Sequence, residues 1–327
     1  MNQPTRLRSF RHRLTHPMPA RSAAVSESWG FFREHILGLL RKAPDLPPPA
    51  PARLPRAGVT WVGHASFVVQ MGGACVLLDP VWSPRLPGGI RRLRAPGVPW
   101  EQLPEVDAVL LSHNHFDHLD LATLRRLPPR TPILAPLGLA GWLRRRGFPA
   151  ARELDWWQGT AVAPGLRAEL VPAHHWSRRG ILDANRSLWG GWVLADGRRK
   201  VHFAGDTAFG TFFRQIGQRH PDIDVALLPV GAYAPRTSNG SAHMDPEEAV
   251  AAFQDLGART MVPMHWGTFR LSPEPVQEPI ERTRAAWEAA GLARSRLADL
   301  EVGQSLSFAP HRPPRPVRAR KVRAATH

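Results

Sequence analysis

The sequence predicts an α/β (α+β) protein in which two β-sheets pack together and helices cover both outer faces, a four-layer αββα sandwich. Three observations favour this class. Short apolar runs typical of strands recur from residue 58 to residue 264. The first runs follow one another as hairpins, whereas the later ones alternate with helical segments. The chain has 327 residues, 43% of them hydrophobic, which is enough for the core of a large domain.

The first predicted strands form a meander, in which Gly72-Gly73 provides a hairpin turn. For the helix after residue 245, Asp245 is a good N-cap, Pro246 suits the first helical position and Glu248 completes a capping box. Strands are expected at 59–61, 66–70, 75–78, 107–111, 131–135, 168–172, 189–194, 201–204, 225–229 and 260–264. Helices are expected at about 120–127, 138–146, 209–219, 246–256 and 278–290.

The two ends of the chain carry most of its positive charge. The net charge is +16, of which residues 1–50 carry +5 and residues 311–327 carry +6. We expect a basic N-terminal arm with a short amphipathic helix and a Pro-rich linker over 1–56, a catalytic domain over 57–309, and a disordered basic tail over 310–327. The helix over 29–42 either docks on the body of the protein or lies on a membrane surface.

Composition also limits where the protein works and what it binds. The single cysteine, Cys75, excludes a disulfide framework, and no run of 18 apolar residues exists to span a membrane. A cytoplasmic location is expected, with peripheral membrane contact through residues 29–42 and the basic tails as a further option. Nucleic acid is not an expected partner, because the charge concentrates in tails and no RNA- or DNA-binding motif is found. The oligomeric state is left open.

One short stretch concentrates metal-binding side chains. Residues 111–120 read LSHNHFDHLD, which places the pattern H-x-H-x-D-H directly after a buried strand. Protonated imidazoles this close together would repel one another, whereas a zinc ion binds neutral imidazole and carboxylate. His113 and His115 lie two residues apart on extended chain and share a side, and Asp117 and His118 follow in the turn, available to a second ion. A chance cluster on a surface loop is the disfavoured alternative.

Three residues at predicted strand ends and one after the first strand complete the candidate set. His175 lies in VPAHHW, Asp206 in FAGDT, His265 in PMHWGTF and His64 in WVGHASF. A lone histidine at a strand end more often has a structural role. Because a rigid sheet gathers such positions at one edge, we expect these four side chains to converge on the H-x-H-x-D-H stretch.

Longer strings then carry a family resemblance, over about residues 60–270. They are WVGHASFVVQ, LLDPVWSPR, DAVLLSHNHFDHLD, PLGL, LDWW, VPAHHW, WGGW, HFAGDTAFG, LLPVGAYAPR, HMDPEEAV and MHWGTF. The chain resembles the metallo-β-lactamase superfamily. The narrower strings LDWW, GAYAPR and HMDPEEAV indicate the branch that contains N-acyl-phosphatidylethanolamine-hydrolysing phospholipase D. Two departures stand out: His174 replaces a glutamine of the family motif, and Ala234 replaces a glutamate.

The resemblance implies two zinc ions per chain. His113, His115 and His175 would hold one ion, and Asp206 would bridge the pair. Asp117, His118 and His265 would hold the other. His175 rather than His174 matches the family in register. The same ligands also suit Mn²⁺ or Fe²⁺.

The resemblance further implies a phosphodiesterase of phospholipase D type that acts on N-acyl-phosphatidylethanolamine-like lipids through a bridging hydroxide. The expected catalytic residues are Asp117, Asp206 and His243. The expected substrate-binding residues are Tyr233, Arg236, His243 and His64. A lactonase or a soluble phosphodiesterase on the same scaffold is the alternative, followed by a nucleic-acid-processing enzyme, because fold alone does not choose the reaction.

Overall fold

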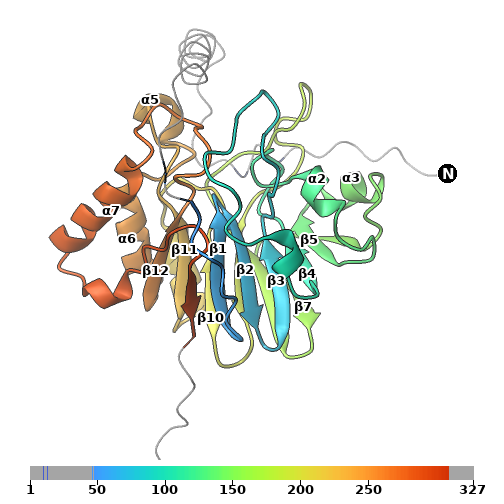
Figure 1. Cartoon of the computed structure of the whole chain (residues 1–327), viewed down its shortest axis with the longest axis horizontal. Coiled ribbons are helices and arrows are strands. Elements are labelled where there is room, and N and C mark those ends of the chain that lie inside the picture. The colour runs from blue at the N-terminus through green and yellow to red at the C-terminus, as the bar shows by residue number, and fades with distance from the viewer. Residues whose placement is uncertain (1–9, 11–12, 14–45, 47, 309–327) are drawn as a thin grey trace, which may run out of the picture.

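The structure, a computed structural model, describes residues 10, 13, 46 and 48–308. Two β-sheets lie at the centre. Figure 1 shows α6 (Pro246–Leu256) and α7 (Glu278–Ala289) on one side of the strands, and α2 (Leu121–Leu124) and α3 (Ala140–Arg144) on the other. The predicted four-layer αββα sandwich is therefore confirmed.

The first sheet has seven strands in the order β13-β1-β2-β3-β4-β5-β6. Its antiparallel half comes from the N-terminal meander, and β3 to β6 pair in parallel. The strands are β1 (Gly58–Gly63), β2 (Ser66–Met71), β3 (Ala74–Leu78), β4 (Ala108–Leu110), β5 (Ile133–Pro136), β6 (Ala151–Leu154) and β13 (Ser305–Ser307). Because β3 and β4 are parallel, the residues that follow them lie at the same edge of the sheet.

The second sheet has six strands in the order β12-β11-β10-β9-β8-β7. Strands β10, β11 and β12 pair in parallel, so the residues after β10 and β12 also share an edge. The strands are β7 (Gly159–Ala163), β8 (Leu166–Val171), β9 (Gly191–Ala195), β10 (Lys200–Phe203), β11 (Val225–Pro229) and β12 (Thr260–Met264). The remaining helical segments are η2 (Trp100–Gln102), α4 (Phe212–Arg219), α5 (Arg236–Asn239) and η3 (Arg294–Arg296).

The alternation of side chains along β2 explains why the first sheet is covered on both faces. Phe67 and Val69 pack into the larger apolar cluster, which also holds Trp192 and Phe203 of the second sheet. Val68 points the other way, into the smaller cluster with residues of α2 and α3. Both faces of the strand are therefore apolar, which is typical of a sheet buried between two layers.

Most predicted elements occur, with ends that differ by a few residues. The sequence reading missed β6, β7, β13 and α5. Strand β7 has no buried residue and β6 is buried only at its two ends, so neither has an apolar alternation that would reveal it. The capping box on α6 is present, with Asp245 accepting from the backbone of Glu248. The predicted helix over 29–42 lies outside the described residues.

Parts of the predicted arm and linker contact the domain. The backbone N–H of Phe10 donates to Asn185 O, and Arg13 forms an ion pair with Asp155 at 3.0 Å. Within the Pro-rich stretch, the backbone N–H of Ala50 donates to Val302 O. Within the described part of the chain, every helix is too short or too polar to traverse a bilayer.

Candidate metal centre

Four nitrogen and oxygen donors converge where β4, β8 and β10 end. His113 Nε2 lies 2.8 Å from His115 Nδ1, and His175 Nε2 lies 3.1 Å from the same atom. Asp206 Oδ2 completes the group, 3.9 Å from the Nε2 atoms of both His113 and His175. Ligand atoms of all four residues lie within 4.8 Å of one another. The sequence predicted this set, and the structure brings it together.

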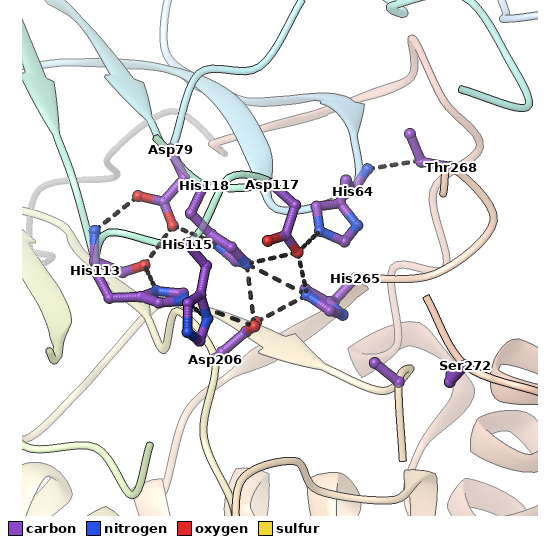
Figure 2. Close-up of polar contacts among 12 residues, drawn as sticks. His64, Asp79, His113, His115, Asp117, His118, Asp206, His265, Thr268 and Ser272 are labelled. Atoms are coloured by element: carbon purple, nitrogen blue, oxygen red, sulfur yellow. Dashed lines mark hydrogen bonds and ion pairs between the residues drawn. The ribbon is translucent and has the colours of Figure 1, made fainter. Parts of the chain in front are cut away.

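A second group lies beside the first and shares Asp206 with it. His118 Nε2 is 3.1 Å from Asp206 Oδ2, and His265 Nε2 is 3.0 Å from Asp206 Oδ1. Asp117 Oδ2 lies 3.4 Å from His118 Nε2 and 3.5 Å from His265 Nε2. Figure 2 shows the side chains of Asp117, His118, Asp206 and His265 pointing toward one another. Asp206 therefore lies between two ligand sets, as a bridging carboxylate would.

The donor atoms fit a pair of metal ions. Ligands about 2.0–2.1 Å from a tetrahedral zinc ion lie about 3.3–3.4 Å from each other, and the separations in both sets scatter around this length. The Nε2 atoms of His118 and His265, for example, are 3.3 Å apart. Two imidazole nitrogens that face each other in this way need a proton or a metal cation between them. The chemistry and the spacing of these donors therefore suit the binding of metal ions.

Burial and neighbouring charge set the protonation of the histidines. Burial lowers the pKa of His113 and His175 well below the usual range, so both are neutral, as metal ligands must be. Burial also lowers the pKa of His118, but the carboxylates of Asp206 and Asp117 outweigh it and raise that pKa well above the usual range. The carboxylates thus attract positive charge to the middle of the cluster, where a metal ion would supply it.

Asp79, at the end of β3, orients two of the candidate ligands and was missed by the sequence reading. Its Oδ1 accepts from Ser112 N at 2.7 Å, and its Oδ2 accepts from His118 Nδ1 at 2.7 Å and from Ser112 Oγ. Ser112 Oγ in turn lies 2.8 Å from His113 Nδ1. These bonds place hydrogen on both Nδ1 atoms and leave both Nε2 lone pairs for metal. The sequence feature that could have revealed Asp79 is the string LLDP, which places this aspartate directly after a predicted strand.

His64 holds a carboxylate of the second set. Its Nε2 is 2.9 Å from Asp117 Oδ2, and its backbone N–H donates to Thr268 Oγ1 at 2.7 Å. Both His64 (φ 57°) and His265 (φ 65°) adopt left-handed backbone conformations that non-glycine residues rarely take. Such strain concentrates at functional sites because surrounding structure must enforce it.

A cavity of about 690 Å³ opens over the cluster. Its wall contains His115, Asp117, His175, Asp206 and His265, so both ligand sets face the same space. Two further groups of residues share the wall. Its apolar residues include Leu86, Ile90, Phe116, Trp176, Ile181 and Leu271, and its cationic residues are Arg13, Arg178 and Arg179. The cavity therefore suits a molecule with an anionic centre and apolar parts.

Of the remaining predicted site residues, some line the cavity and others do not. His243 lines the cavity, with its ring centroid 5.1 Å from that of His175, and burial lowers its pKa to about 4. Tyr233 does not line the cavity: its hydroxyl donates to Glu278 Oε1 at 2.6 Å. His64 is also outside the cavity wall, and its side chain is 1% exposed.

Arg236 and His174 are likewise placed by contacts that the sequence did not reveal. The guanidinium of Arg236 donates to His243 O and to Glu248 Oε1, both at 2.8 Å, so it braces the start of α6 outside the cavity wall. His174 and His175 both line the cavity, but the ring of His174 packs against that of Phe212 at 4.7 Å and only the His175 ring enters the ligand set. The structure thus separates the two adjacent histidines.

Comparisons with known proteins identify the family of the chain. Residues 75–266 match the family model of the beta-lactamase superfamily domain. An uncharacterized protein of Mycobacterium tuberculosis is 44% identical over 244 residues, which cover 71% of this chain and 64% of that protein. The chain thus spans somewhat less than two thirds of that relative.

Two further comparisons name activities for the proteins concerned. The N-acyl-phosphatidylethanolamine-hydrolyzing phospholipase D 1 of Caenorhabditis elegans is 34% identical over 247 residues, covering 70% of this chain and 69% of that enzyme. The solved structure of a metallo hydrolase from Ignicoccus hospitalis matches with a TM-score of 0.58 and 26% identity, over 77% of this chain and 97% of that one.

Proposed function

Because this chain belongs to the beta-lactamase superfamily and is a metal-dependent hydrolase of that fold, we propose that it is a binuclear zinc phosphodiesterase of phospholipase D type. Its proposed substrate is an N-acyl-phosphatidylethanolamine-like lipid. The observation that carries the proposal is the cavity, which joins two ligand sets, three arginines and an apolar wall in one space.

Different residues would hold each of the two proposed metal ions. His113, His115 and His175 would hold one ion, Asp117, His118 and His265 the other, and Asp206 both. When bound, a pair of zinc ions supplies a hydroxide near neutral pH and neutralises charge on phosphate oxygens. Asp79 and His64 keep His118 and Asp117 in place through the hydrogen bonds described above.

Residues around the ligand sets suit a phosphodiester. The imidazole of His243 faces the cavity and is neutral at pH 7, since burial lowers its pKa to about 4, so it can donate a hydrogen bond to a phosphoryl oxygen. Arg178 and Arg179 add positive charge at the wall, which favours an anionic substrate. The apolar residues of the wall exclude water and give acyl chains a place to lie.

Product analysis with isotopic water tests this proposal. The purified full chain, loaded with zinc, is incubated with N-acyl-phosphatidylethanolamine in H₂¹⁸O, and the products are identified by mass spectrometry. We expect phosphatidic acid and N-acylethanolamine, with the heavy oxygen in the phosphate because the proposed hydrolysis breaks the P–O bond to the N-acylethanolamine and adds an oxygen of water to phosphorus. Asp206→Ala should abolish the reaction.

A parallel panel of lactones and of soluble phosphodiesters identifies the alternatives. Turnover of a lactone but of no phosphodiester would overturn the proposal. Turnover of soluble phosphodiesters without any of the lipid would keep the chemistry and refute the substrate. Metal analysis of the same samples should find about two zinc ions per chain.

A further inference from the structure

Exposed apolar side chains gather at the mouth of the cavity. Among the described residues, the large hydrophobic side chains that are exposed are Phe116 at 37%, Ile181 at 86% and Leu182 at 80%. Phe116 and Ile181 both belong to the cavity wall, and Leu182 is adjacent in the chain. Scattered exposed hydrophobic residues need no explanation, but a group that surrounds the entrance to a site indicates an interaction surface.

Hydrogen bonds within the loop that carries Ile181 and Leu182 fix its backbone. The Asp183 carboxylate accepts from the backbone N–H groups of Arg179 at 3.0 Å and Gly180 at 2.7 Å. At the base of the loop, the backbone N–H of Asn185 donates to Ser177 O at 2.7 Å. These bonds fix the backbone on both sides of Ile181 and Leu182, so their exposure is built into the loop.

Arginine and aromatic side chains cluster around Arg179, which belongs to the cavity wall. The Arg179 guanidinium lies 4.2 Å from the ring centroid of Phe116 and 5.4 Å from that of Trp142, and the guanidinium of Arg146 lies 3.7 Å from the Trp142 ring. Arg178 is exposed on the loop itself. An aliphatic tip beside aromatic rings and cationic groups is the composition that binds the interface of an anionic bilayer.

We propose that the loop over residues 176–186 docks the chain on an anionic lipid bilayer, with Ile181 and Leu182 inserted among the acyl chains and Arg178 on lipid phosphates. A protein partner fits the observations less well, because stable interfaces bury about 800 Å² per partner and this tip offers two aliphatic side chains. The inference rests on the proposed function in one respect: a lipid substrate would pass from the bilayer directly into the cavity.

Vesicle co-sedimentation of the full chain tests the docking. We expect binding to phosphatidylcholine vesicles that contain phosphatidylglycerol and much weaker binding to phosphatidylcholine alone. Ile181→Ser with Leu182→Ser should weaken partitioning about a hundredfold, since each buried aliphatic side chain is worth about tenfold or more. The swap of Ile181→Leu with Leu182→Ile keeps the apolar surface and should retain binding.

Charge is tested by a matched pair of variants. Arg178→Ser should weaken binding to the anionic vesicles severalfold, whereas Arg167→Ser removes an exposed arginine at the opposite end of β8 and should leave binding unchanged. Equal binding by the double serine variant and the unmodified chain would overturn the proposal. So would a double variant that changes only the oligomeric state in analytical ultracentrifugation, because the patch would then join copies of the chain.

Hydrolysis of a soluble phosphodiester, measured on the same samples, separates this inference from the proposed function. Vesicle binding that depends on Ile181 and Leu182, in a protein inactive on every phosphodiester, would support docking and refute the phosphodiesterase. Activity on the soluble ester together with vesicle binding that ignores these side chains would refute docking alone.

Discussion

Replacing Asp79 by asparagine isolates the contribution of a residue that lies outside the two ligand sets and orients them. The carboxylate accepts three hydrogen bonds, from Ser112 N, Ser112 Oγ and His118 Nδ1. An amide of the same size has one accepting oxygen. If that oxygen keeps the bond to Ser112 N, the amide nitrogen faces His118 Nδ1, and the imidazole must move its proton to Nε2. That nitrogen is the one that faces Asp206, Asp117 and the second cation site.

The magnitude follows from this loss of orientation. Removing the partner that fixes a ligating histidine typically costs about 10–100-fold in metal affinity, which equals about 1.4–2.8 kcal/mol. We therefore expect Asp79→Asn to bind the ion of the His118 set about 10–100-fold more weakly. The ion held by His113, His115 and His175 should be affected less, because Ser112 Oγ still reaches His113 Nδ1 at 2.8 Å.

Titration of the metal-free protein with zinc against a chromophoric chelator measures both affinities. Asp107→Asn is the matched control, since Asp107 also holds a backbone N–H, that of Cys75 at 2.8 Å, but forms part of neither ligand set. Thermal unfolding of each metal-free variant shows whether the fold survives. Two zinc ions bound by a folded Asp79→Asn variant with unchanged affinity would refute the orienting role.

Three further predictions follow from individual contacts. His175→Ala should lose one zinc ion per chain and nearly all activity, whereas His174→Ala should keep both ions in elemental analysis; loss of metal from the second variant alone would contradict the placement. Tyr233→Phe removes the hydrogen bond to Glu278 and should cost about 1 kcal/mol of stability in denaturant unfolding with KM unchanged; a raised KM would show contact with substrate. Burial lowers the pKa of His202 from 6.5 to about 3, so its neutral form stabilises the fold fully above pH 6.5, and this contribution is lost at up to about 1.4 kcal/mol per pH unit as the pH falls toward 3. His202→Leu should flatten the acid limb of a stability–pH curve, and an unaltered limb would contradict the assignment.

The fold could be predicted from the sequence because its signals are local. The strand-like residues 66–70 beside the Gly72-Gly73 turn predicted β2, and the capping residues Asp245 and Glu248 predicted the start of α6. Strand β7 was missed for the converse reason: its residues are exposed or half-buried, and it forms through pairing with β8 rather than through its own pattern.

By itself, the sequence determined the chemistry of the site. Four residues of metal-binding type lie within six positions, and histidine and aspartate follow at later strand ends. Their imidazole nitrogens and carboxylate oxygens are set by residue type, whatever path the backbone follows. Only the tertiary structure decided the directions of side chains. In the structure His175 lies in the ligand set, whereas the ring of His174 packs against Phe212. The guanidinium of Arg236 donates to Glu248 and does not line the cavity. A side chain's direction depends on backbone torsions and on partners distant in the chain, which are fixed only when the two sheets pack together.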